Sequence, residues 1–191
     1  YDSNGRCDIF LRDTVLNTTV IVSKNLLSRA ANGNSYNPSI SADGRYIAFS
    51  SRASDLILIG GNTTSDVYLY DRGTDSIELV SLATDNVRGN ASSSRPSVSD
   101  DGNLIAFISD ANSLDYDQAD TNGDADIYLR NRSASTTKRV SIAADGTESN
   151  YDSYYPVISG DGNYIAFSSD ASTLLASDTD TYDDIYRYDI T

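Results

Sequence analysis

The chain contains 191 residues, and a hydrophobic fraction of 39% is enough to build the core of one domain. Lysine and arginine number 14 against 28 aspartate and glutamate residues, and the resulting net charge of −14 argues against binding to nucleic acid or to an anionic membrane surface. No apolar run approaches the ~18 residues of a membrane span, and the absence of histidine removes the commonest general base and zinc ligand.

The first predicted strands lie near the N-terminus, at residues 8–13 and 18–23, where β-branched and aromatic residues stand between turn residues. Cys7 is the only cysteine, so an intrachain disulfide is impossible. An interchain disulfide or a free thiol would be compatible with this count. We expect Cys7 to be a small buried residue within the first strand, around Asp8-Ile9-Phe10.

The next stretch carries four predicted strands, which we call a, b, c and d. A short strand from Pro38 leads to the pair Asp43-Gly44, and the second strand begins with Tyr46-Ile-Ala-Phe49. An Asp-Gly pair between two strands predicts a tight hairpin with a type I′ turn, in which both central residues have positive φ. Strands at 66–71 and 76–81 complete the set.

The rest of the chain repeats this pattern. The block that starts at Pro38 recurs at Pro96 and Pro156, at steps of 58 and 60 residues, and each copy contains Asp-Gly followed by Ile-Ala-Phe. Strand c occurs four times, starting at Asp8, Asp66, Asp126 and Asp184, and a third strand d is predicted at 137–141. A unit of this kind cannot bury both sheet faces alone, so neighbouring units must stack.

The block Pro38-Ser-Ile-Ser-Ala-Asp43-Gly44-Arg-Tyr46-Ile-Ala-Phe49-Ser-Ser resembles the WD40-like repeat of TolB-type β-propellers. That repeat also forms the non-catalytic domain of prolyl oligopeptidase-like enzymes. The resemblance extends over nearly the whole chain and implies an all-β fold of four-stranded antiparallel blades around an axis. It implies little about function, because propellers carry many activities.

The strand count predicts about three and a half blades, and therefore an incomplete ring, since propellers have about 4–8 blades. We predict a single domain over 1–191, with a partial blade at 1–23, blades at 38–81 and 96–141, and a partial blade at 156–191. Open faces of this kind invite association. Either the chain is a fragment of a larger secreted propeller protein, or partial blades of two copies complete each other in a ring or a filament. The chain contains no methionine, which is typical of a processed or excised product. We favour self-association because no obvious flanking segment accompanies the repeats.

The loops that precede strand c are the candidate metal sites. All acidic residues except Glu78 and Glu148 are aspartates, whose short carboxylates suit tight turns and calcium ligation, although an acidic surface alone would also explain them. Calcium takes about six to eight oxygen ligands, and a short loop of carboxylates and amides can supply several. The candidate ligands are Asp2, Asn4 and Asp8 in the first unit, Asp115, Asp117, Asp120, Asn122, Asp124 and Asp126 in the third, and Asp178, Asp180 and Asp184 in the fourth.

Structural roles are also possible for the strand-c aspartates, the aspartates of the Asp-Gly pairs and a group of tyrosines. The second unit has no acidic loop but keeps Asp66, so Asp8, Asp126 and Asp184 either cap strand c or bind the ion. The aspartates of the Asp-Gly pairs are expected to be turn residues. A tyrosine cluster at Tyr151, Tyr154 and Tyr155 packs against strand a or stacks on a sugar ring.

These observations predict a non-catalytic protein, because the sequence contains no histidine, no nucleophile elbow and no hydrolase domain. We expect a secreted structural protein, extracellular or periplasmic, that associates with other copies of itself or with another protein. Calcium is the one cofactor considered, and no organic cofactor, catalytic residue, nucleic acid partner or membrane insertion is predicted. The alternative is a ligand- or protein-binding propeller module, with its ligand residues unassigned.

Overall fold

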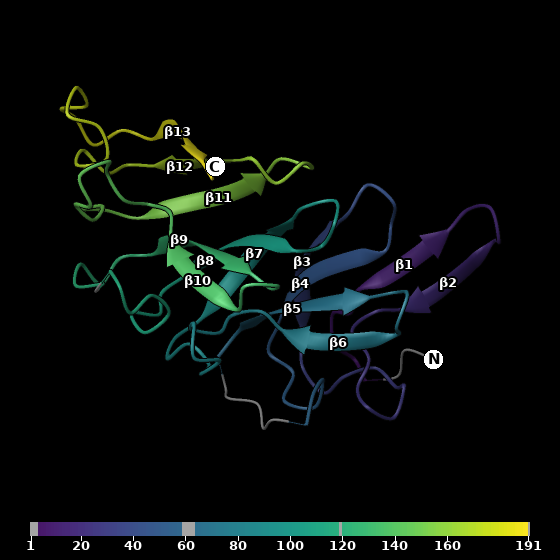
Figure 1. Cartoon of the computed structure of the whole chain (residues 1–191). Coiled ribbons are helices and arrows are strands. Elements are labelled where there is room, and N and C mark those ends of the chain that lie inside the picture. Colours follow the sequence, from purple (N-terminus) through teal and green to yellow (C-terminus); the bar gives the residue numbers. More distant parts are fainter. Residues whose placement is uncertain (1–3, 59–63, 119, 191) are drawn as a thin grey trace.

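The computed structural model describes residues 4–58, 64–118 and 120–190. Within these ranges the protein consists of β-strands joined by loops, and it contains no helix that could cross a membrane (Figure 1). Every strand pairing is antiparallel. The predicted all-β class is therefore confirmed.

The strands form four separate sheets, which we number as blades in chain order. Blade 1 is the hairpin of β1 (Phe10–Asp13) and β2 (Thr18–Ile21). Blade 2 contains β3 (Ser35–Ile40), β4 (Tyr46–Ser51), β5 (Asp66–Asp71) and β6 (Ser76–Leu79). Blade 3 contains β7 (Ser93–Val98), β8 (Leu104–Ser109), β9 (Asp126–Asn131) and β10 (Thr136–Arg139). Blade 4 contains β11 (Ser153–Ile158), β12 (Tyr164–Ser169) and β13 (Asp184–Asp189).

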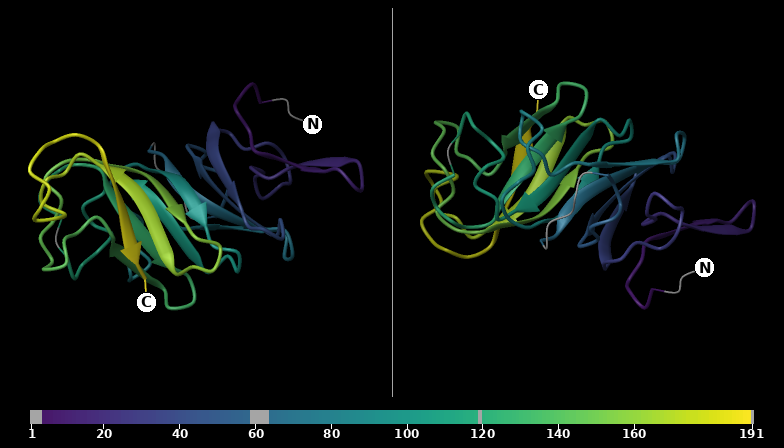
Figure 2. Two further views of the ribbon diagram at one scale, coloured as in Figure 1. Left: turned by 90° about the horizontal axis from the view of Figure 1, so that it is seen from above. Right: turned by 90° about the horizontal axis from the view of Figure 1, so that it is seen from below.

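The blades follow one another in sequence order, with the purple hairpin of blade 1 at one end and the yellow strand β13 of blade 4 at the other (Figure 2). Two blades have four strands, while blade 1 has two and blade 4 has three. This arrangement confirms the prediction of four-stranded antiparallel blades and of an incomplete ring.

The core lies between neighbouring sheets and repeats from blade to blade. Strands b and c place a phenylalanine and a tyrosine directly opposite each other, and the two rings stack. The centroid separations are 5.9 Å for Phe49 and Tyr68, 6.1 Å for Phe107 and Tyr128, and 5.7 Å for Phe167 and Tyr186. Partners directly opposite each other lie on the same face of a sheet, so each aromatic pair fills the core on one face of its blade.

Strand a of blades 2, 3 and 4 contains a β-bulge that was not predicted from the sequence. The register shifts at the residue before the proline, and Asn37, Arg95 and Tyr155 adopt φ values of 52°, 50° and 52°. Non-glycine residues rarely occupy this left-handed region. A bulge also removes the need for a ladder hydrogen bond at the next residue, which is why proline is tolerated there.

The predicted type I′ turn is wrong. Gly44 has φ of 71°, but Asp43 does not have positive φ, and the N–H of Gly44 donates to the carbonyl oxygen of Ser41 at 2.9 Å. These features define a type I turn followed by a left-handed glycine. The Ser41 hydroxyl makes two hydrogen bonds inside the loop: it donates to Asp43 at 2.7 Å and accepts from the N–H of Tyr46 at 2.9 Å.

The expected burial of Cys7 is also wrong. Its side chain is exposed, and it precedes β1 instead of lying within it. The segment is held through its backbone: the N–H of Cys7 donates to the Asn34 side chain at 3.0 Å, and its carbonyl accepts from the N–H of Ser35 at 2.8 Å. These two backbone contacts fix the position of the exposed Cys7.

Neighbouring blades are joined through serines of strand a. The hydroxyl of Ser39 accepts from the N–H of Val98 at 3.2 Å, and the hydroxyl of Ser97 accepts from the N–H of Ile158 at 3.0 Å. At the equivalent position blade 4 carries Val157, which has no hydroxyl. The outward face of blade 4 therefore differs chemically from the faces that join the inner blades.

Candidate functional site

The aspartate at the start of strand c forms the same polar contact in the first three blades. Its carboxylate accepts a hydrogen bond from the serine after strand d, and that serine accepts from the next backbone N–H of strand c. In blade 2 Ser81 donates to Asp66 at 2.8 Å and accepts from Val67 at 3.2 Å. Ser23 with Asp8, and Ser141 with Asp126, repeat the arrangement. These aspartates therefore fasten strand c to strand d.

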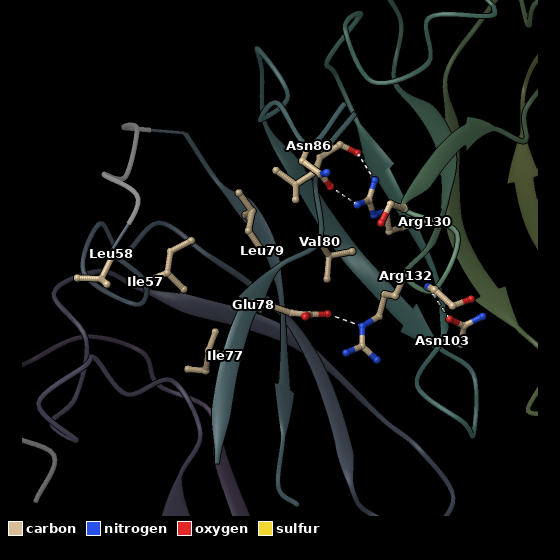
Figure 3. Close-up of a pocket in the computed structure, with 13 residues that line it drawn as sticks. Ile57, Leu58, Ile77, Glu78, Leu79, Val80, Asn86, Asn103, Arg130 and Arg132 are labelled. Carbon is tan, nitrogen blue, oxygen red and sulfur yellow. Dashed lines mark hydrogen bonds and ion pairs between the residues drawn. The ribbon is translucent and has the colours of Figure 1, made fainter. Parts of the chain in front are cut away.

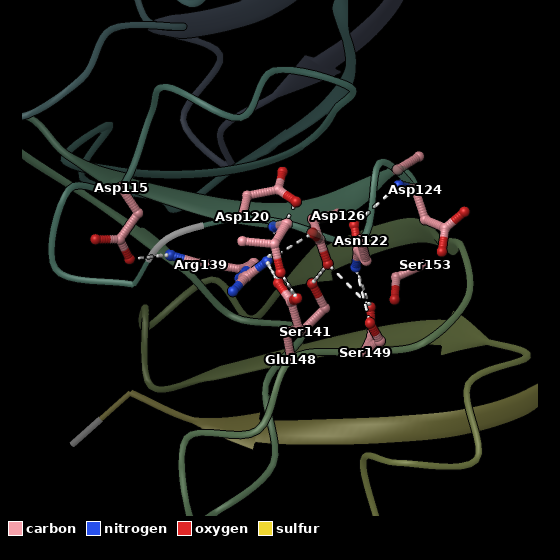
Figure 4. A network of polar contacts seen from close by, with 12 residues as sticks. Asp115, Asp120, Asn122, Asp124, Asp126, Arg139, Ser141, Glu148, Ser149 and Ser153 are labelled. Atoms are coloured by element: carbon pink, nitrogen blue, oxygen red, sulfur yellow. Dashed lines mark hydrogen bonds and ion pairs between the residues drawn. The ribbon is translucent and has the colours of Figure 1, made fainter.

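The buried aspartates of blades 2 and 3 each meet one arginine. Arg88 contacts Asp66 at 2.7 Å, and Arg139 contacts Asp126 at 3.1 Å. The Arg139 guanidinium also lies 3.0 Å from Glu148 and 3.6 Å from Asp120, so three carboxylates surround it (Figure 4). Burial raises the pKa of Asp126, while Ser141 and Arg139 oppose this effect by favouring its charged form.

The carboxylates of the third acidic loop thus surround a protein cation, the Arg139 guanidinium. Asp120 and Asp126 are brought together around Arg139, whereas Asp115 and Asp124 lie on opposite sides of it (Figure 4). Asp115 accepts from the backbone N–H of Arg139 at 2.8 Å and from that of Asp117 at 3.0 Å.

The amide groups of the first and third loops act as donors to the protein. Asn122 donates to the Ser149 carbonyl at 2.8 Å, and Asn4 donates to Asp8 at 2.9 Å and to the Ala31 carbonyl at 2.7 Å. Asp2 lies outside the described residues. Metal binding by these two loops stays a prediction.

In the fourth loop the predicted ligands do come together. Ligand oxygens of Asp178, Asp180 and Asp184 lie within 4.8 Å of one another, and within the described ranges they are the one acidic group this close. No described lysine or arginine forms an ion pair with them. The Tyr186 hydroxyl donates to Asp178 at 2.6 Å.

Sequence reasoning overlooked Arg139, although the repeat contains a signal for it. Arg139 occupies the position of Leu79 in blade 2 and of Ile21 in blade 1. A buried arginine at an otherwise apolar repeat position requires anionic partners, because an unpaired buried charge is very costly. The acidic loop beside it supplies them.

The tyrosine cluster divides into a packed part and an exposed part. Tyr154 donates to Asp152 at 2.9 Å, and its ring lies 6.1 Å from that of Tyr155. Tyr155 is exposed and stacks on the guanidinium of Arg95 in blade 3 at 4.6 Å. Tyr151 is exposed as well.

Two strands, β3 of blade 2 and β13 of blade 4, carry apolar side chains whose equivalents in the other blades are buried. Ile40 on β3 is 53% exposed, while Val98 and Ile158 at the same position are each 6% exposed. Ile185 on β13 is 78% exposed, while Val67 and Ile127 are fully buried. We call these the β3 face (Pro38, Ile40) and the β13 face (Val157, Ala166, Ile185).

No protein-family model and no curated protein matches the chain. Among solved structures, a candidate TolB from Agrobacterium tumefaciens is similar over 99% of this chain and 55% of its own, with 20% identity and a TM-score of 0.59. The chain has the TolB-type β-propeller fold.

Two further solved structures are similar in fold to this chain. A prolyl endopeptidase is similar over 96% of this chain and 24% of its own, with 13% identity and a TM-score of 0.55. An oligogalacturonate lyase from Vibrio parahaemolyticus is similar over 97% of this chain and 42% of its own, with 16% identity and a TM-score of 0.52. The chain therefore spans about half the length, or less, of the structures that it matches.

These structures correct the prediction that the chain is not an enzyme. A peptidase and a lyase are similar in structure to nearly all of this chain, so the missing histidine and nucleophile elbow do not separate the chain from enzymes. At these identities the similarity shows the fold and assigns no reaction.

Proposed function

We propose that the chain is a protein-binding propeller module whose β3 and β13 faces associate with further blades, supplied by a second copy of the chain. The exposure of Ile40 and Ile185, at positions that are buried in the inner blades, carries this proposal. Exposed contiguous apolar surface of this kind is typical of protein interaction sites.

The two faces are different, so contact between them is heterologous. Strand a of blade 2 (β3) packs against strand a of blade 3 (β7). The same stacking between two copies would bring Ile40 of one copy towards Val157 and Ala166 of the other. A heterologous contact of this type extends a filament or closes a ring, depending on the rotation between copies. Val157 makes the proposed contact more apolar than the contacts between the inner blades.

Static light scattering of the purified chain over a range of concentrations tests the association. Ile40→Asp places a charge in the β3 face, and Ile185→Asp places one in the β13 face. We expect either change to weaken association by at least about tenfold, or 1.4 kcal/mol. Leu16→Asp, at an exposed position in the turn between β1 and β2, is the matched control. A mixture of the two face variants retains one intact pair of faces and should stop at a dimer. A monomer at about 100 μM, where even a weak contact of ~5 kcal/mol would be populated, would refute the proposal.

We also propose that calcium binds the fourth loop and stabilises the module. The support is the equivalence of Asp178 and Asp184 with Asp120 and Asp126, which close around the Arg139 guanidinium in blade 3. Calcium should raise the melting temperature of the protein, EDTA should reverse the rise, and Asp180→Asn should abolish it. Asp183→Asn is the matched control. An unchanged melting temperature at millimolar calcium would contradict this part of the proposal.

We propose an extracellular or periplasmic location, which the acidic, aspartate-rich composition supports. Cell fractionation with an antibody against the chain tests the location. Recovery of the protein solely with cytoplasmic markers would contradict it.

A further inference from the structure

The outer edge of blade 2 offers unpaired backbone groups. β6 is the last strand of its sheet, and its register pairs Ser76 and Glu78 with Asp71 and Leu69 of β5. Two residues further on, the N–H of Val80 donates to the carbonyl of Val67 at 2.8 Å, which fixes the alternation of the ladder. The N–H and C=O groups of Ile77 and Leu79 therefore point away from β5.

The corresponding edge of blade 3 is closed by side chains. The N–H of Thr137 donates to the Thr84 hydroxyl at 3.2 Å, and that of Arg139 donates to Asp115 at 2.8 Å. Ile77 and Leu79 take these two places in β6, and within the described ranges neither N–H has a side-chain acceptor. In the repeat, Ile57 occupies the position of Asp115. The same fold thus closes one edge strand and leaves the other open.

A groove of about 860 Å³ surrounds the open edge (Figure 3). Ile57, Ile77 and Leu79 line one side of it, and Glu78 lies on the other side with Arg130 and Arg132 of blade 3. An extended chain laid along β6 would direct successive side chains alternately to these two sides. One side is apolar and the other contains two cations.

Arg130 gives the groove a defined electrostatic preference. It is 5% exposed, and its described hydrogen-bond partners are neutral oxygens of Ala83, Asn86 and Thr137 at 3.1, 2.8 and 3.2 Å. Burial lowers its pKa because the charged form is desolvated. Arg132 forms an ion pair with Glu78. Within the described ranges Arg130 forms no ion pair, and Glu78 acts on it only at longer range, so a carboxylate in the groove would give this buried charge a direct partner.

We propose that the edge of β6 is a strand-addition site for an extended protein segment in which apolar residues alternate with acidic residues. The segment hydrogen-bonds to the backbone of Ile77 and Leu79, directs its apolar side chains towards Ile57 and directs its carboxylates towards Arg130 and Arg132. The site lies on the outer strand of blade 2 and includes neither the β3 face nor the β13 face. It is therefore independent of the association proposed above.

Fluorescence anisotropy with a labelled peptide of alternating valine and glutamate tests this site on the folded chain. N-methylation of every valine, or of every glutamate, blocks opposite edges of the peptide backbone. Saturable binding that is lost with one methylation pattern and kept with the other is expected, together with slower amide exchange at Ile77 and Leu79. Equal binding of both methylated peptides would overturn strand addition, and so would the absence of saturable binding by the unmethylated peptide.

Protein variants test the edge and the charges separately. Ile57→Asp copies the closure by Asp115 and should weaken peptide binding by at least about tenfold, or 1.4 kcal/mol. Val15→Asp adds the same charge at an exposed position in blade 1 and should leave binding unchanged. Arg132→Gln should weaken binding about fivefold at low salt and reduce its salt dependence, because the cation lies at the rim of the groove. Equal affinity for a peptide of alternating valine and lysine would overturn the predicted preference for acidic residues.

Discussion

Removal of the Ser81 hydroxyl should be among the most damaging single-atom changes in blade 2. The hydroxyl donates to Asp66 at 2.8 Å and accepts from the N–H of Val67 at 3.2 Å, and Asp66 is fully buried. Loss of a hydrogen bond to a charged group costs about 1.5–3 kcal/mol, and an unsatisfied buried N–H costs about 1–3 kcal/mol. Ser81→Ala should therefore lower the free energy of unfolding by about 3–5 kcal/mol, a large part of the ~5–15 kcal/mol of a typical domain.

The equivalent change in blade 3 should cost less, because Asp126 has a second hydroxyl partner. Ser149 donates to the same Asp126 oxygen at 3.1 Å, whereas Asp66 keeps only Arg88 among its described partners. We expect Ser141→Ala to be milder than Ser81→Ala by about 1 kcal/mol. Ser76→Ala, which removes an exposed hydroxyl of β6, should change stability by less than about 0.5 kcal/mol.

Urea denaturation monitored by circular dichroism measures these differences. At about 2–4 °C per kcal/mol for a chain of this size, Ser81→Ala should lower the melting temperature by roughly 10 °C. A double-mutant cycle with Asp66→Asn isolates the contact between the two side chains. A loss below about 1 kcal/mol for Ser81→Ala, or a larger loss for Ser141→Ala, would refute the reasoning.

Two further predictions concern an ion pair and a glycine. Arg45 donates twice to Asp71, at 2.9 Å each, and lowers its pKa from 3.8 to about 2. The stabilisation is therefore present above pH 3.8 and is lost as the pH falls through about 2, and it is small because solvent screens the exposed Arg45. Carboxyl NMR titration should show the Asp71 midpoint moving back towards 3.8 in Arg45→Gln, and an unchanged midpoint would contradict the assignment. Gly102 and Gly44 have φ values of 68° and 71°, but a Cβ at Gly102 would lie 2.4 Å from the Tyr46 ring, while at Gly44 it would meet nothing closer than 3.9 Å. Gly102→Ala should therefore destabilise more than Gly44→Ala in thermal unfolding, and equal losses would show that strain at φ alone decides the cost.

The repeat makes the blades predictable, because its apolar positions are set by stacking between sheets. Phe49 and Tyr68 recur in every unit that has strands b and c, so the alternation and the strand order could be derived from spacing alone. The turn type could not be derived in this way. It is accompanied by side-chain contacts within the loop, in which the Ser41 hydroxyl donates to Asp43 and accepts from the N–H of Tyr46.

The candidate site was less predictable than the fold, because it depends on departures from the repeat. Aspartates identify the loops in the sequence, but in the third loop the carboxylates surround Arg139. Arg139 stands out only when the repeats are aligned, because Leu79 takes its place in blade 2. The open edge of β6 depends in the same way on Ile57 replacing the aspartate found at position 115. Substitutions between units therefore carry the functional information, and consensus positions carry the fold.

The serine contacts that join Ser39 to Val98, and Ser97 to Ile158, make each blade's stability conditional on its neighbour. Blades 2 and 3 each pack against a neighbour on both sides, whereas blades 1 and 4 each pack against a neighbour on one side, so resistance to unfolding should be lower in the end blades. A protease that acts on locally opened segments should cut first in blade 1 or blade 4 and last in blades 2 and 3. Any partner that covers an end blade would then lengthen the lifetime of the whole array by removing the places where it begins to open.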